Sequence, residues 1–245
     1  MSAPRGVSGS FLKRIAAAAM LIDHCTHTFF LKYWFPVRGV TAFTRGLYYV
    51  LRGVGRVSFP IYCFLLAEGF RRTRSRGRYL LRLGLFALIS EAPYDMALEN
   101  GLWSWNSQNV LFTLALGLGA IWAFEEITGG DPERCSGLRL SAAFAAAGAA
   151  AAAAALLRTD YGWKGVFVIL LMHLFRDRPG ERFLTAGPAL LYAGPLEAAA
   201  WPVFPLLDRY NGLRGSQRKF FHYLFYPGHL LLLALMRRAL AGPPG

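Results

Sequence analysis

The first apolar run of the sequence carries ionisable side chains where a membrane-spanning helix would normally be apolar. Asp23, His24 and His27 all lie within it. Such groups are costly inside a bilayer and usually face an interior cavity or a partner. On a helix, all three can border one face, because His27 follows Asp23 by four residues. The adjacent Asp23 and His24 diverge by about 100°. We therefore expect Asp23 to pair with His27 or with an arginine of another helix rather than to orient His24.

A neutral histidine inside a membrane protein can act as a general base. It can equally form a buried hydrogen bond that joins two helices. The residues alone leave both readings of His24 open.

Two arginines in the second apolar run, Arg52 and Arg56, are four residues apart and can share a helix face. Guanidinium groups in this arrangement could clamp a phosphate or a carboxylate. They could also balance acidic side chains of other helices, with Glu68, Glu91 and Asp23 as candidates.

Glu91 and Asp95 are likewise four residues apart, with Pro93 between them. Paired carboxylates are typical of acid–base chemistry or amine binding. They are also typical partners of arginine.

The last apolar run carries His222, Tyr226 and His229, with Pro227 predicted to kink its helix. Two histidines seven residues apart are too weak a pattern for a metal site. The sequence has no HExxH, Walker loop, GxSxG or paired CxxC motif, which argues against most soluble enzyme classes. We expect no metal.

The elements that must position these residues are long apolar helices. Hydrophobic residues make up 55% of the 245-residue chain. Runs of about 18–22 residues recur, each long enough to cross a hydrocarbon core of about 30 Å. The predicted spans are about 11–31, 47–70, 79–98, 108–127, 138–157, 162–175, 183–206 and 219–236.

The fold class predicted from these runs is all-α, a polytopic transmembrane helical bundle of about eight spans with one or two broken helices. Residues 1–10 are predicted to be a flexible tail, residues 11–240 a single transmembrane domain, and residues 32–46 a polar-aromatic loop. Glycine, proline and arginine interrupt 47–70, and four prolines interrupt 183–206, so these two runs are the ones expected to be broken.

The formal net charge is +13, and five arginines fall within Arg71 to Arg78. Arginines in short loops beside apolar runs indicate the cytoplasmic side of a membrane and contact with anionic lipid. This distribution excludes nucleic-acid binding as the expected function. We predict a multi-pass protein of the bacterial inner membrane with both termini cytoplasmic. The basic loop 208–219 then falls outside, unless the run 183–206 does not cross simply.

An ordered set of segments along nearly the whole chain resembles the TraX family, membrane proteins associated with acetylation of the amino terminus of conjugative pilin. The segments are 12–15 with 20–24, 51–60 leading into 68–70, 79–83 with 87–95, 109–114, 160–162, 210–215 and 225–230.

The resemblance implies transfer of an acetyl group from acetyl-CoA to an amine or hydroxyl, in a pilin amino terminus or a surface glycan. The implied base is His24, with Asp23 beside it in the catalytic set. Arg71 to Arg78 could attract the anionic donor or anchor the protein on lipid. The substrate-binding candidates are Arg52, Arg56, Glu68, Glu91, Asp95, Asn109, Asp160, Tyr210, Asn211, Arg214 and His229.

Two other functions fit the residues. Ionisable groups within spans and proline-broken helices also suit a proton-coupled small-molecule transporter. A non-enzymatic assembly factor for a surface structure is the third possibility.

Overall fold

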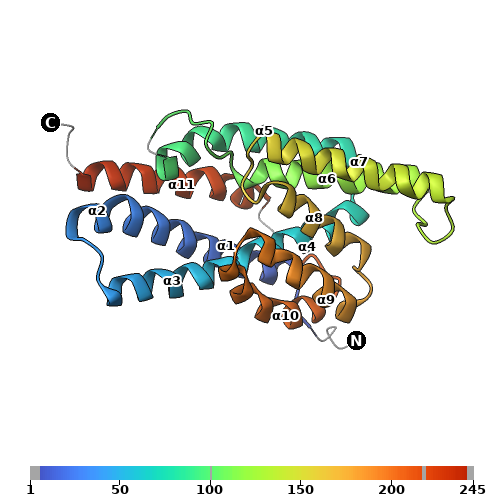
Figure 1. Cartoon of the computed structure of the whole chain (residues 1–245), viewed down its shortest axis with the longest axis horizontal. Coiled ribbons are helices and arrows are strands. Elements are labelled where there is room, and N and C mark those ends of the chain that lie inside the picture. The colour runs from blue at the N-terminus through green and yellow to red at the C-terminus, as the bar shows by residue number, and fades with distance from the viewer. Residues whose placement is uncertain (1–5, 100, 217–218, 242–245) are drawn as a thin grey trace. The chain divides into compact units, whose positions relative to one another are not determined.

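A computed structural model of the chain describes residues 6–99, 101–216 and 219–241, without the side chains of residues 219–223 and 241 (Figure 1). These residues form α-helices with short π and 3-10 segments, and they contain no strand beyond two isolated bridges. The all-α prediction is thus confirmed for the described part of the chain. The residues group into two compact units. The single transmembrane domain over 11–240 stays a prediction.

The first unit comprises the described residues within 6–62, 89–99, 101–104, 194–216 and 219–241. Within it α1 packs against α3, and the C-terminal helix α11 packs against the two π-helices η1 and η2. Figure 1 shows α1, α2 and α3 as the blue hairpin. The elements are α1 (Gly9–Thr26), η1 (His27–Trp34), α2 (Phe35–Arg38), α3 (Ala42–Arg56), η2 (Asp95–Glu99), η4 (Pro195–Val203), α10 (Phe204–Asp208) and α11 (Lys219–Ala241).

The second unit comprises residues 63–88 and 105–193. Its helix α6 packs against α7 and α8, and α8 packs against α9. The alanine-rich α7 buries only small side chains, which allows its backbone to approach its neighbours closely. The elements are α6 (Val110–Thr128), α7 (Gly137–Leu156), α8 (Gly162–Leu174), α9 (Pro179–Leu190) and η3 (Leu191–Ala193). Two helices contribute residues to both units: α4 (Ser58–Arg72) and α5 (Arg76–Tyr94).

Three helical stretches are long and apolar enough to cross a membrane: Ala42–Arg72, Val110–Thr128 and Gly137–Leu156. The shorter α8 is also apolar. Large apolar side chains on several helices are more than half exposed, as expected where a helix faces lipid rather than water; examples are Phe43, Val50, Leu81, Leu88 and Leu138. The chain is a membrane protein, but the predicted number of eight spans is not confirmed.

Both runs expected to be broken are broken. The run 47–70 is divided between α3 and α4 at Val57, and the run 183–206 leaves its α-helix after Leu190 and continues in 3-10 turns. The predicted loop 32–46 is wrong, because helix continues to Arg38 and resumes at Ala42. The early restart has a local cause, since Thr41 and Thr44 form a reciprocal capping box at the start of α3.

Residues 6–10, predicted as part of a loose tail, are held by the loop that precedes α11. The amide of Val7 donates to the Arg209 carbonyl at 2.9 Å, and the amides of Gly9 and Ser10 donate to the Leu213 and Arg214 carbonyls at 2.8 and 2.9 Å. These bonds satisfy amides at the start of α1, which have no partner within the helix. Helix α1 therefore begins at Gly9 rather than at residue 11.

The same bonds bring residues 7–10 and residues 209–214 directly together. The sequence put the N-terminus inside and the basic loop 208–219 outside, unless the run 183–206 does not cross simply. The side of the membrane on which each segment lies stays a prediction. Gly215 permits the close approach, because its φ of +68° suits glycine and a Cβ there would overlap the Ser10 hydroxyl.

Candidate functional site

Four charged side chains of the first unit form one buried ion-pair network. Arg52 Nη1 lies 2.5 Å from Asp23 Oδ2, and Arg56 Nη2 lies 2.5 Å from Asp23 Oδ1. Arg56 also reaches Glu197 Oε1 at 3.0 Å with its other terminal nitrogen. None of the four side chains is more than 18% exposed. Asp23 thus joins α1 to α3, and Glu197 joins η4 to the same cluster.

The network balances its charges, with two guanidinium groups facing two carboxylates. Buried charges are tolerated only when they are paired and hydrogen-bonded. Arg52 and Arg56 were predicted to clamp a substrate phosphate or carboxylate. In this structure Asp23 takes that place, so an anionic ligand would have to compete with a carboxylate already bound.

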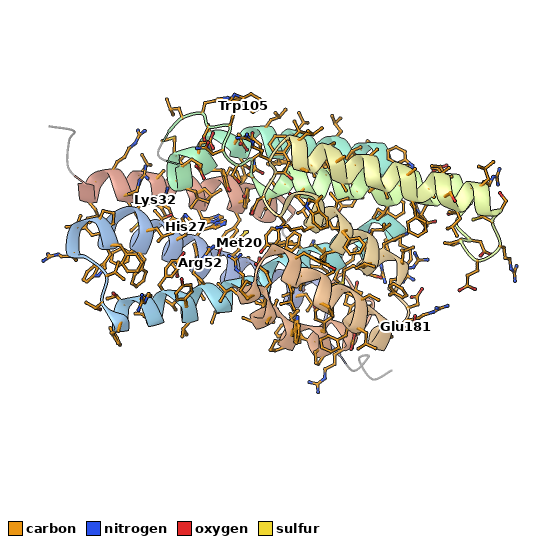
Figure 2. All side chains as sticks on the ribbon, viewed as in Figure 1. Met20, His27, Lys32, Arg52, Trp105 and Glu181 are labelled. Atoms are coloured by element: carbon orange, nitrogen blue, oxygen red, sulfur yellow. The ribbon has the colours of Figure 1, made fainter. Side chains whose placement is uncertain are left out.

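Close packing of α1 on α3 makes the network possible. A Cβ at Gly55 would overlap the Asp23 carboxylate, whose Cγ would lie only 2.7 Å away. Glycine at this position lets the Asp23 carboxylate reach both arginines. Figure 2 labels Met20, His27 and Arg52 in this part of the first unit.

His24 does not take part in that network. Its Nδ1 lies 2.7 Å from Nε2 of His229, a residue 205 positions away on α11. Both residues are at most 9% exposed, and their rings are nearly parallel. Tyr226 meets both rings edge-on. The helical geometry that separated Asp23 from His24 in the sequence is thus borne out, and the partner of His24 is a second histidine.

Irregular helix flanks the histidine pair. Helix α1 changes to a π-helix at His27, three residues after His24, and α5 changes to a π-helix at Asp95. Wider turns of this kind re-aim side chains and occur often at functional sites. The π-helices pack against each other and against α11.

Glu91 and Asp95 are both buried in the first unit, at 3% and 0% exposure. The backbone amide of Ser104 donates to Asp95 Oδ2 at 2.7 Å, which ties down the loop after η2. Asp95 Oδ1 is buried with no hydrogen-bond partner among the described residues. That oxygen is free to accept a bond from a ligand or from water.

Three predicted substrate-binding residues belong to the second unit, where each has a structural role. Glu68 pairs with Arg72 at 3.2 Å on its own helix. Asn109 caps α6 and donates from Nδ2 to the Ala87 carbonyl at 2.8 Å, which joins α5 to α6. The Asp160 carbonyl accepts from the Thr113 hydroxyl.

The loop that carries the predicted substrate-binding residues Tyr210, Asn211 and Arg214 also has structural bonds. Asn211 accepts the Leu213 amide at 3.0 Å through its side chain, and Tyr210 forms a bridge with Val7. The side chain of Arg214 is exposed while its carbonyl holds Ser10. The loop therefore closes the N-terminal end of α1.

Two features were missed from the sequence. Glu197 is a lone carboxylate in an apolar, proline-rich run, and that anomaly could have flagged it. His173 bonds Glu125 at 2.7 Å in the second unit, joining α8 to α6. No group of three or more side chains suited to a metal ion is brought together in the described residues.

The comparisons with known proteins extend over both units. A family model described as TraX protein matches residues 8–237. The chain is also 30% identical, over 249 aligned residues, to a probable fimbrial assembly protein FimC, serogroup H1, of Dichelobacter nodosus; the alignment covers 91% of this chain and 92% of the relative. No solved structure matches. Because the family model spans nearly the whole sequence, the chain belongs to the TraX family.

Proposed function

We propose that this protein is an integral membrane acetyltransferase that moves an acetyl group from acetyl-CoA to an amine. The observation that carries the proposal is the buried His24, hydrogen-bonded to a second histidine and left out of the charge-balanced network beside it. A neutral histidine has one ring nitrogen with a lone pair, which can take a proton from an acceptor.

The chemistry would run in one transfer. His24 takes a proton from the acceptor nitrogen as that nitrogen attacks the thioester carbonyl. The new carbon–nitrogen bond forms, the carbon–sulfur bond breaks, and the leaving thiolate receives the proton back from the histidine. Arg52, the more exposed of the two arginines at 18%, is the donor suited to the oxyanion that develops on the carbonyl.

The acceptor is proposed to be the amino terminus of a pilin. The similar protein of Dichelobacter nodosus is named for fimbrial assembly, which supports a pilin over a glycan. Asp95 supports an amine over a hydroxyl, since its Oδ1 is buried and open to a cationic donor.

Five arginines from the end of α4 to the start of α5 are proposed to attract the anionic donor or anionic lipid. Arg71, Arg72 and Arg76 are engaged by acidic side chains of the second unit. Arg74 and Arg78 are exposed and make no ion pair within the described ranges, so their guanidinium groups can reach a phosphate.

The proposed location is the bacterial inner membrane, with the N-terminus and loop 209–215 in the cytoplasm. Lys13, Arg14, Arg209 and Arg214 then share the cytoplasmic side, as the positive-inside rule expects. Helix α11 follows that loop, and its 23 residues span about 34 Å, enough to carry the C-terminus across. We therefore propose that the N-terminus is cytoplasmic and that the C-terminus lies on the other side of the membrane.

The test uses the full chain purified into lipid nanodiscs with labelled acetyl-CoA. Two peptides serve as acceptors, identical except that one has a free and one a blocked amino terminus. We expect label on the free-amine peptide together with release of the coenzyme thiol. Label on neither peptide, with an intact, folded protein, would reject the proposal for a pilin amine.

An assembly role without catalysis is separated by complementation in cells. The proposal requires that a deletion strain stays defective when it receives the His24→Ala protein at normal membrane levels. Full rescue by that variant would favour the assembly factor instead.

A further inference from the structure

We propose that His229 fixes the tautomer of His24, so that Nε2 is its basic nitrogen, and that His229 accepts the proton which His24 gathers. The first half follows from hydrogen bonds within the first unit. The second half rests on the proposed function.

The backbone carbonyl of Phe225 sets the first step. His229 Nδ1 lies 2.6 Å from this oxygen, one helical turn back on α11. A carbonyl oxygen can only accept a hydrogen bond. His229 Nδ1 therefore carries a proton, and in the neutral ring His229 Nε2 carries the lone pair. The Phe225 ring stacks on the His229 imidazole, with ring centroids 4.8 Å apart, and holds the orientation of that imidazole.

The protonation of His229 in turn determines which ring nitrogen of His24 carries a proton. His24 Nδ1 lies 2.7 Å from the lone pair of His229 Nε2, so His24 must be the donor in that bond. A neutral His24 then has its proton on Nδ1 and its lone pair on Nε2. The opposite tautomer would set two lone pairs against each other.

The two hydrogen bonds run in one direction. His24 donates to His229, and His229 donates to the Phe225 carbonyl. When His24 Nε2 takes a proton from the acceptor, the proton on Nδ1 can shift along the 2.7 Å bond to His229 Nε2. His229 is then the charged ring, still donating to Phe225 through Nδ1. The proton count is unchanged, because the return shift restores His24 for delivery to the leaving thiolate.

No acidic side chain is bonded to either ring in the described residues. The nearby acid, Asp23, is held by Arg52 and Arg56. His229 was predicted to bind substrate. Its ring is instead buried between His24, Tyr226 and Phe225, which suits a positioning residue.

The first test is spectroscopic and needs no activity. Nitrogen-15 spectra of histidine-labelled protein in nanodiscs report which ring nitrogen is protonated, and single substitutions assign the signals. We expect His24 as the Nδ1–H tautomer in the wild type, and loss of that preference in His229→Phe. A wild-type His24 protonated on Nε2 alone would overturn the inference. His173→Gln, in the second unit, is the control that should leave the His24 signals unchanged.

The second test separates positioning from proton acceptance. The side-chain oxygen of Gln can accept the His24 Nδ1 bond but cannot take its proton, so His229→Gln should keep the tautomer and KM while kcat falls about tenfold. His229→Phe should lower kcat by about 10²-fold. Equal kcat in wild type and His229→Gln would overturn the relay and leave the tautomer result standing. If wild type shows no transfer, the spectra alone decide the tautomer, and the failure belongs to the proposed function.

Discussion

Two buried histidines, His24 in the first unit and His173 in the second, have hydrogen-bond partners of different kinds. His24 in the first unit bonds to another histidine, whose own proton goes to a backbone carbonyl. His173 in the second unit bonds to Glu125, whose same oxygen lies 3.4 Å from Arg176. The first arrangement joins two imidazole rings, between which a proton can pass, and a carbonyl that only accepts a hydrogen bond. The second contains a carboxylate already engaged by an arginine.

The difference shows that burial of a histidine says little about its role until its partner is known. Glu125 ties α6 to α8 and to the residues after α8, and the Phe70 ring meets His173 edge-on. A carboxylate shared in this way stabilises the packing of helices. A carboxylate bonded to a histidine can also orient a catalytic histidine. Measured activity must therefore distinguish His24 from His173 as the base.

The largest expected effect distinguishes the two histidines by activity. His24→Ala should lower kcat by about 10²–10⁴-fold, the usual contribution of a general base. His173→Ala, matched in burial, should leave kcat within a few-fold once the folded fraction is equalised. The measurement is label transfer from acetyl-CoA. The reverse pattern would move the proposed catalytic base to the second unit.

The next largest effect compares the stability lost on replacing two carboxylates, Asp23 in the first unit and Glu125 in the second. Asp23→Asn leaves two buried guanidinium groups without their shared partner and should cost about 3–5 kcal/mol of stability. Glu125→Gln should cost less, since Arg176 keeps a contact with Asp177 at 3.3 Å. Thermal denaturation midpoints, measured for both variants in the same detergent, show which substitution costs more stability. Equal midpoints for wild type and Asp23→Asn would contradict the buried network.

The smallest effect compares two helical glycines. Gly55→Ala in the first unit puts a methyl group into the Asp23 carboxylate and should destabilise by about 1–3 kcal/mol. Gly119→Ala in the second unit meets nothing within 4 Å and should stabilise by up to about 1 kcal/mol through helix propensity. Opposite signs of the midpoint shift are expected. A gain in stability from Gly55→Ala would show that α1 and α3 do not approach so closely.

Local patterns in the sequence were enough for several features. Run length and composition predicted an all-α membrane protein, and clustered prolines and glycines predicted which runs break. The 100° step between neighbours on a helix separated Asp23 from His24. These features depend on residues that are close together in the sequence, so they can be predicted without a fold. The count of eight spans is not confirmed, because only three helical stretches of the described residues are long and apolar enough to cross a membrane.

The tertiary structure alone decided the partners. His24 meets His229 across 205 positions, and Arg56 meets Glu197 across 141. The N-terminal residues meet loop 209–214 through backbone hydrogen bonds. A hydrogen bond of about 3 Å requires two helices to pack at one particular depth and rotation. No local pattern specifies that placement, so the chemistry suggested by the residues of one helix became a site only through the packing of others.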